Sequence, residues 1–218
     1  MQKILFVAYQ FPPRGGPGVQ RSLNFVKHLR KNGYDPIVLT IQEKDIKKAG
    51  YLFDESLLQQ IPVDIKIIRT PSYEPVAFIR FLMKIRLYRI AWFFFYYFFW
   101  EWSARWPNKV YESAKKLIKE HDIKIVYTSS SPFSSMILGK LLKKRMGIKW
   151  VADLRDPFTD AYAWAFPSKL HWYLSRKFEK NYFSKPDRLI VNTPETKKLF
   201  LKRKLITENK ILCITNGF

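Results

Sequence analysis

The chain enters regular structure with Lys3-Ile4-Leu5-Phe6-Val7-Ala8-Tyr9, an apolar run that follows a single lysine. A strand whose side chains are apolar at every position is buried on both faces, as in a parallel sheet that is covered by helices. A glycine-containing loop follows this strand, and the apolar spacing after the loop predicts a helix over about residues 19–31. This order of elements predicts an α/β fold.

The alternation of strands and helices continues to the end of the sequence. We expect helices over about 133–146 and 168–183, and a further helix that starts at Pro194. The remaining strands are predicted over about 35–41, 63–69, 123–128, 148–152, 188–191 and 210–215. Right-handed crossovers between such strands build a doubly wound parallel sheet, Rossmann-like in its topology. No internal repeat or low-complexity linker interrupts residues 1–218, so we expect a single domain.

The charge of the chain is unusual, because 39 Lys and Arg residues oppose 18 Asp and Glu residues and give a net charge of +21. Such an excess favours an anionic partner, which is nucleic acid, a lipid surface or a phosphorylated substrate. The single cysteine, Cys213, excludes an internal disulfide and lies in an apolar run, so a buried, inert thiol is expected. No signal peptide is visible, and a cytoplasmic location is expected.

Charged residues follow directly on the apolar strand predicted over residues 148–152. They are Asp153, Arg155 and Asp156, and Pro157 then stops regular structure. Ligands of open parallel α/β sheets bind at the carboxyl ends of the strands. Two carboxylates and a guanidinium are costly to place there for packing alone, which favours a functional site. The alternative is a structural ion pair that ties down a loop.

The loop after the first strand, Arg14-Gly15-Gly16-Pro17-Gly18, is typical of a phosphate cradle, because glycines let backbone N–H groups approach an anion at a helix N-terminus. Arg21 stands where a dinucleotide-binding motif has its third glycine, and the second strand ends in Thr40 without an acidic residue at that end to hold a ribose. These departures disfavour NAD binding. No Gly-Lys-Ser or Gly-Lys-Thr follows, so the loop is not a P-loop.

Hydroxyl groups end another strand at the same edge of the predicted sheet, where Ser129 and Ser131 precede a helix. They either cap that helix or bind a sugar or phosphate. The histidines His28, His121 and His171 lack the spacing of a metal site, so no metal is expected. The lysine-rich stretches carry no interleaved aromatic residues, and specific nucleic-acid binding is not expected.

An aromatic and basic insertion over about residues 76–106 interrupts this alternation. Its apolar run Ile90–Trp100 would span roughly 16 Å as a helix, about half the thickness of a bilayer core, so it is too short to cross a membrane. Aromatic rings beside cations are typical of an interfacial membrane anchor, although these cations do not form one helical stripe. The alternative is that the aromatics belong to the core. The expected membrane-contact residues are Arg80, Lys84, Arg86, Arg89, Trp92, Phe95 and Phe99.

Several motifs converge on one known family. They are the opening strand with its glycine loop, the serine-rich strand end, WVADLRDPFTDAY at 150–162, DRLIVNTPETKKLF at 187–200 and KILCITNGF at 210–218. In this order they resemble the N-terminal half of family-4 retaining glycosyltransferases of the GT-B fold. The resemblance covers essentially the whole chain, and the combination is more specific than any single motif.

The resemblance implies a Rossmann-like domain that binds the acceptor, while a second domain holds most of a nucleotide-sugar donor and no metal is needed. Gly15, Gly16 and Gly18 would lie against the donor diphosphate. The implied catalytic group is Asp153, beside the transferred sugar, with Arg155 and Asp156. The acceptor-binding residues expected on this basis are Arg14, Ser129, Ser131, Asp160 and Tyr162.

The sequence given stops at Phe218, where the resemblance places the crossover into the donor domain. Glu112 and Glu120 have the spacing of the family's acidic donor motif, but they precede a strand of this domain, and we interpret the match as coincidence. The expected function is therefore the acceptor-binding half of a retaining glycosyltransferase. It would act at the cytoplasmic membrane face on a lipid-linked or cell-envelope glycan, and it would be inactive alone. The alternative is a non-catalytic basic module that binds anionic membrane or nucleic acid.

Overall fold

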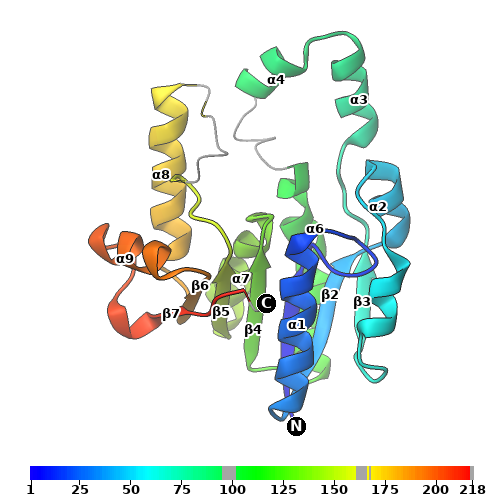
Figure 1. The fold of residues 1–218 in the computed structure, drawn as a ribbon, viewed down its shortest axis with the longest axis vertical. Coiled ribbons are helices and arrows are strands. Elements are labelled where there is room, and N and C mark those ends of the chain that lie inside the picture. The colour runs from blue at the N-terminus through cyan, green and yellow to red at the C-terminus, as the bar shows by residue number, and fades with distance from the viewer. Residues whose placement is uncertain (95–101, 161–165, 167, 217–218) are drawn as a thin grey trace.

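The computed structural model describes residues 1–94, 102–160, 166 and 168–216. Its centre is a seven-stranded sheet in the order β3-β2-β1-β4-β5-β6-β7 (Figure 1). Every pair of neighbouring strands is parallel, which confirms the predicted doubly wound α/β fold. The strands are β1 Gln2–Ala8, β2 Tyr34–Ile41, β3 Ile67–Thr70, β4 Ile125–Ser130, β5 Lys149–Leu154, β6 Arg188–Val191 and β7 Ile211–Cys213.

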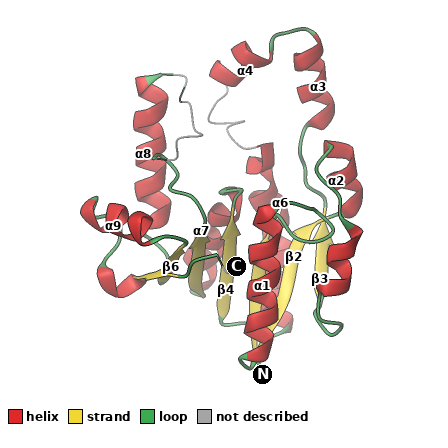
Figure 2. Cartoon of the chain, viewed as in Figure 1, coloured by secondary structure: helices red, strands yellow, loops and turns green. Residues whose placement is uncertain are grey.

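Helices cover both faces of this sheet (Figure 2). Three short 3-10 segments, Glu55–Gln60, Trp102–Arg105 and Glu208–Lys210, lie between the longer elements. The α-helices are α1 Pro17–Lys31, α2 Glu43–Ala49, α3 Val76–Lys84, α4 Tyr88–Phe94, α6 Trp106–Glu120, α7 Ser134–Met146, α8 Lys169–Phe183 and α9 Pro194–Lys202.

Strand β1 is buried on both faces, as its unbroken apolar sequence predicts. Leu5 and Val7 belong to the larger core, together with apolar residues of α6, α7, α8 and α9. Ile4 and Phe6 belong to a smaller core under α1. Successive residues of one strand therefore serve two cores, and the chain reverses its winding direction between the adjacent strands β1 and β4. This reversal is the position at which open α/β sheets bind their ligands.

Some predicted boundaries are wrong. The third strand begins at Ile67 and not at Val63, because Val63 lies fully exposed in a turn after Pro62. The last strand is shorter than predicted, because a 3-10 turn over residues 208–210 precedes it and the strand ends at Cys213. Cys213 is only partly buried, although a fully buried thiol was expected. Strands β4 and β5 each run two residues beyond their predicted ends, which places Asp153 inside a strand.

The insertion forms two short α-helices, α3 and α4, and the 3-10 segment Trp102–Arg105 in its described part. A turn in which Arg86 adopts a φ of 58° joins α3 to α4. Both helices extend beyond the carboxyl ends of the strands, opposite the start of α8 (Figure 1). Within the described residues, no helix combines the length and the apolar character needed to cross a membrane.

Asp187 connects the start of β6 to β5. Its carboxylate accepts a hydrogen bond from the Trp150 backbone N–H at 2.8 Å and lies 2.8 Å from the Lys143 ammonium. Partial burial opposes ionisation, but the contacts from Lys143 and Trp150 outweigh it and hold the pKa of Asp187 below its ordinary value. A carboxyl whose pKa is lower in the folded state stabilises the fold above the unfolded pKa.

We therefore expect Asp187→Ala to reduce the free energy of unfolding by about 1–3 kcal/mol at pH 7, because the Trp150 N–H loses its acceptor. Asp187→Asn keeps a neutral acceptor and should cost less. Urea denaturation from pH 7 to pH 2 tests the sign: the advantage of the wild type over Asp187→Asn should be full above about pH 4 and disappear as the pH falls further. A difference that is constant with pH would contradict the assignment.

Candidate functional site

The glycine loop lies at the carboxyl end of β1 and leads into α1. Gly16 is the N-cap of α1 and has a φ of 107°, a conformation that residues with a side chain rarely adopt. The loop is tied to the segment after α2, since the Gly15 N–H donates to the Leu52 carbonyl at 2.8 Å and the Asp54 N–H to the Pro13 carbonyl at 2.7 Å. The first turn of α1 contains no acidic residue. The backbone amides of this turn therefore face no carboxylate of their own helix.

Arg155 packs against the glycine loop and joins three strand ends. Its Nε donates to the Ser130 carbonyl at 2.6 Å, and its Nη2 donates to the Ser131 carbonyl at 2.8 Å and to Gln10 Oε1 at 3.2 Å. A Cβ on Gly18 would lie 1.7 Å from Arg155 Nη1, so a side chain there would displace the Arg155 guanidinium. Burial lowers the pKa of Arg155, and the Asp156 carboxylate is the largest opposing influence. The structure thus brings together the predicted Gly18, Ser131 and Arg155.

Asp153 is fully buried and forms an ion pair with Arg21. Arg21 Nη2 donates to Asp153 Oδ1 at 2.7 Å, and Arg21 Nε donates to Asp153 Oδ2 at 2.9 Å. Burial raises the pKa of Asp153, and the hydrogen bonds and charge of Arg21 oppose this shift. The structure therefore contains the structural ion pair that was the alternative interpretation of Asp153 from the sequence. Any effect of Asp153 on a substrate would have to pass through Arg21.

The other predicted site residues lie in different surroundings. Asp156 is exposed at the carboxyl end of β5. Ser129 is buried and accepts a hydrogen bond from Ser22 Oγ at 3.2 Å. Asp160 forms ion pairs with Arg203 and Arg176, which belong to the α8–α9 side of the domain. Tyr162 lies outside the described residues.

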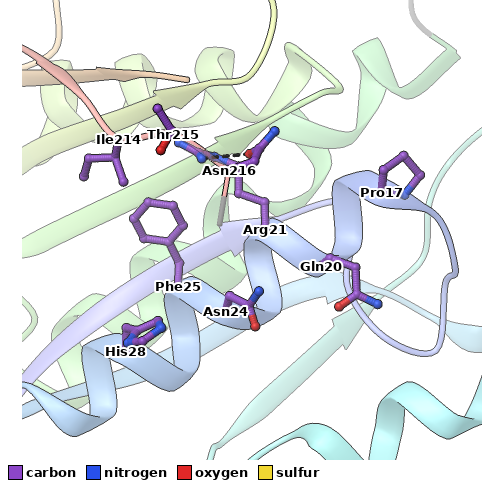
Figure 3. A pocket seen from close by; sticks show the side chains of 9 residues that line it. All are labelled: Pro17, Gln20, Arg21, Asn24, Phe25, His28, Ile214, Thr215 and Asn216. Carbon is purple, nitrogen blue, oxygen red and sulfur yellow. Dashed lines mark hydrogen bonds between the residues drawn. The ribbon is translucent and has the colours of Figure 1, made fainter. Parts of the chain in front are cut away.

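A groove of 610 Å³ runs along α1 beside residues 214–216, as Figure 3 shows. Arg21 borders this groove and donates from Nη1 to Asn216 Oδ1 at 3.0 Å. The Phe25 ring also lies against the Arg21 guanidinium, 4.9 Å from Cζ to the ring centroid. Arg21 therefore connects the C-terminal segment to the buried Asp153. The groove is lined by Pro17, Gln20, Arg21, Asn24, Phe25, His28, Ile214, Thr215 and Asn216.

A second, smaller cavity of 160 Å³ lies at the carboxyl end of β1, and we call it the polar pocket. Both of its tyrosine hydroxyls donate to the Glu74 carboxylate, and the hydroxyl of Tyr51 does so at 2.9 Å. Burial and the Glu74 carboxylate raise the pKa of Tyr9 and Tyr51, so both hydroxyls keep their protons. The pocket is lined by Tyr9, Gln10, Arg14, Tyr51, Glu74, Ser103 and Pro132.

Of these residues, the sequence indicated only Arg14 as a site residue. Glu74 is a lone acid between Pro71 and Pro75 in the loop after β3. An acid in a proline-bounded loop at a strand end was the available signal. Among the described residues, no group of three His, Cys, Asp or Glu side chains is arranged to hold a metal ion.

The described part of the insertion presents an apolar and basic surface, which we call the apical surface. All four predicted cations, Arg80, Lys84, Arg86 and Arg89, are exposed. His171 of α8 adjoins this surface, with Nε2 3.1 Å from the Phe93 carbonyl. Phe95, Phe99 and the side chain of Trp92 lie outside the described part of the structure. The exposed apolar members are Phe78, Phe81, Met83, Ile85, Leu87, Ile90 and Phe93, continued on α8 by Leu170, Trp172 and Tyr173.

The glycine loop and the strand-end polar groups of this doubly wound sheet can be compared with those of known protein families. Residues 18–218 match the sequence profile of Glycosyltransferase Family 4. The chain belongs to glycosyltransferase family 4. The predicted resemblance to this family is thereby confirmed. No curated protein matches this family-4 chain in sequence.

Solved structures share the fold of the family-4 chain at low sequence identity. Sucrose-phosphate synthase from Thermosynechococcus elongatus aligns with all of it at 15% identity and a TM-score of 0.59, over 49% of that protein. UDP-GlcNAc 2-epimerase from Methanocaldococcus jannaschii aligns with 99% of it at 11% identity and a TM-score of 0.54, over 46% of that protein. The epimerase from Neisseria meningitidis, bound to UDP-GlcNAc, aligns with 97% at 14% identity and a TM-score of 0.54. The family-4 chain spans about half the length of these proteins.

Proposed function

We propose that this chain is the acceptor-binding half of a retaining glycosyltransferase. The enzyme would transfer a sugar from a nucleotide-sugar donor to a lipid-linked or cell-envelope glycan, in polysaccharide biosynthesis. The family-4 match over residues 18–218 carries the proposal. The site supports it, because the glycine loop and the ends of β4 and β5 meet where such sheets bind ligands.

Catalysis in this proposal is mainly positional and electrostatic. The donor diphosphate lies at the N-terminus of α1, where the amides after Gly16 face no acidic residue in their first turn. Arg14 and Arg155 add positive charge beside this loop, which favours a departing diphosphate. Asp156 is the exposed carboxylate of this strand end and orients a hydroxyl of the acceptor or donor. Asp153 acts as a positioning residue, because it contacts Arg21 and lies out of reach of a ligand.

A second α/β domain holds most of the donor in the proposed enzyme. The chain aligns with 49% of the length of the two-fold longer sucrose-phosphate synthase, which supports a partner domain of similar size. The chain by itself then offers only the loop amides and the nearby arginines to a nucleotide. Nucleotide binding by this half alone should be weak, with dissociation constants of about millimolar or poorer.

The apical surface places the enzyme on a membrane in this proposal. Its exposed aromatic and aliphatic side chains stand among Arg80, Lys84, Arg86 and Arg89. Apolar groups at headgroup depth and cations near anionic lipids are the two requirements of interfacial binding. A peripheral position at the cytoplasmic face would bring the carboxyl edge of the sheet close to a lipid-linked acceptor.

The test compares the 218-residue chain with the product of the same gene extended past Phe218. Each protein is incubated with UDP-, GDP- and dTDP-sugars and a membrane-lipid extract of the source organism, and release of nucleoside diphosphate is followed. We expect steady release with the extended protein and none with residues 1–218 alone. Steady turnover by the chain alone would disprove the division of labour. The absence of any extract-dependent release by the extended protein would disprove the proposed activity.

A further inference from the structure

The polar pocket contains a carboxylate that is fixed in position and still able to accept hydrogen bonds. The Tyr9 hydroxyl donates to Glu74 Oε1, and the Tyr51 hydroxyl lies 2.9 Å and 3.0 Å from the two carboxylate oxygens. A carboxylate offers about four lone-pair directions, so two phenol donors leave acceptor capacity toward the cavity. Tyr9 is itself buried against Trp106, with the rings 5.2 Å apart and edge-on. The position of Glu74 is therefore set before any ligand arrives.

Two planar donor groups complement this carboxylate. The Arg14 guanidinium lies over the Tyr51 ring, with Cζ 3.7 Å from the ring centroid, which holds it at the wall of the pocket. Gln10 accepts a hydrogen bond from Arg155 through Oε1, so the Gln10 amide N–H groups are left to donate elsewhere. A pocket with a carboxylate acceptor and planar donors suits a ligand whose adjacent groups both donate and accept. Adjacent hydroxyls on a sugar ring have this property.

The charge and size of the pocket narrow the class of ligand. Glu74 and Arg14 carry opposite charges within one small cavity, so their charges balance and suit a neutral ligand, whereas an anion would also be repelled by the Glu74 carboxylate. The cavity of 160 Å³ has room for about five waters at the ~30 Å³ that each occupies in the liquid, and this is the scale of one six-membered sugar ring.

The pocket is also connected to the glycine loop. Gln10 lines the pocket and binds Arg155, and Arg155 in turn packs on Gly18 at the start of α1. A ligand in the pocket would lie next to the loop to which we assign the donor diphosphate. Arg155 would hold the two sites at a fixed separation.

We propose that the polar pocket binds one neutral pyranose ring of the acceptor, with Glu74 accepting from adjacent ring hydroxyls and with Arg14 and Gln10 donating to ring oxygens. This assignment rests on the proposed function for the identity of the ligand as an acceptor. The binding itself is independent of sugar transfer and can be measured without it.

The test uses the isotopically labelled 218-residue chain and NMR titration with the methyl glycosides of glucose, galactose, mannose and N-acetylglucosamine. At least one of these should shift the backbone signals of Gln10, Tyr51 and Glu74. Glu74→Gln keeps the shape of the side chain and removes its charge, and it should weaken that binding by about tenfold or more. Glu112→Gln, an exposed glutamate on α6, is the matched control and should change nothing. Inorganic phosphate is added as an anionic competitor and should not displace the glycoside.

Three results would overturn the proposal: no glycoside shifts the pocket signals, the glycoside binds Glu74→Gln as tightly as the wild type, or phosphate displaces it. Should Glu74→Gln fail to fold, Arg14→Met decides in its place, because Arg14 lies on the pocket rim and is partly exposed. The proposed function can fail separately. Glycoside binding without any transfer by the extended protein would reject the enzyme and keep the pocket, and transfer without pocket shifts would reject the pocket alone.

Discussion

Replacing Asp153 by alanine should lower the free energy of unfolding by about 3–5 kcal/mol, a large fraction of the roughly 5–15 kcal/mol by which an ordinary domain is stable. The physical reason is the charge that remains. Arg21 is 6% exposed and would keep a buried guanidinium without its carboxylate, while Asn216 would hold only one of its N–H groups. Urea denaturation followed by circular dichroism measures the effect.

Asp156→Ala is the matched control, because Asp156 is an exposed aspartate three positions along the same chain segment. It should change the stability by less than about 0.5 kcal/mol. A second variant, Arg21→Met with Asp153→Leu, removes both charges together and should recover most of the loss. An Asp153→Ala protein as stable as the wild type would contradict the ion-pair role and return Asp153 to the candidates for direct substrate contact.

Replacing Arg80, Lys84, Arg86 and Arg89 together by glutamine should weaken binding to anionic vesicles by roughly a thousandfold. Each cation near an anionic surface contributes about 1 kcal/mol, so the four contribute about 4 kcal/mol at low salt. Co-sedimentation with vesicles of phosphatidylglycerol and phosphatidylcholine measures this, and the same loss should be reached in the wild type as salt screens the cations. All four side chains are exposed, so the melting temperature should stay unchanged.

The control removes the same number of charges from another part of the surface. Its four exposed lysines are Lys116 and Lys119 on α6, Lys124 before β4 and Lys144 on α7. Their replacement by glutamine should leave most of the vesicle binding intact. A second set, Phe81→Ser with Ile90→Ser, tests the apolar part, which should weaken binding at every salt concentration. If the control set and the apical set lose vesicle binding equally, net charge alone determines the binding, and a defined membrane surface is contradicted.

The sheet could be predicted because each strand carries its own signal. The apolar run of β1 and its burial on two faces follow from residues that are adjacent in the sequence. The boundary of β5 could not be predicted in the same way. Trp150, Ala152 and Leu154 continue the buried face of β5, but Asp153 between them faces the other side and is neutralised by a helix residue 132 positions away. A charged residue in that pattern looks like a strand end until its partner is known.

The site shows the same limit. The glycine loop and the charged end of β5 were each predicted to belong to a ligand site, and they do meet, at Gly18 and Arg155. The direction of each side chain was beyond prediction, since it depends on long-range partners. Glu74 enters the polar pocket only because the loop after β3 places it beneath Tyr9, from a segment 65 positions away.

The contacts of Arg155 have a consequence for how this domain can change its specificity. Its guanidinium holds the end of β4 through the main-chain carbonyls of Ser130 and Ser131, and a carbonyl is present whatever the side chain. The contact between Arg155 and the end of β4 therefore does not depend on the side chain of residue 131. Substitutions at residue 131 can change the side chains at the carboxyl edge of the sheet while the contact between Arg155 and β4 is kept. The domain could thereby come to bind a different acceptor without a change of fold.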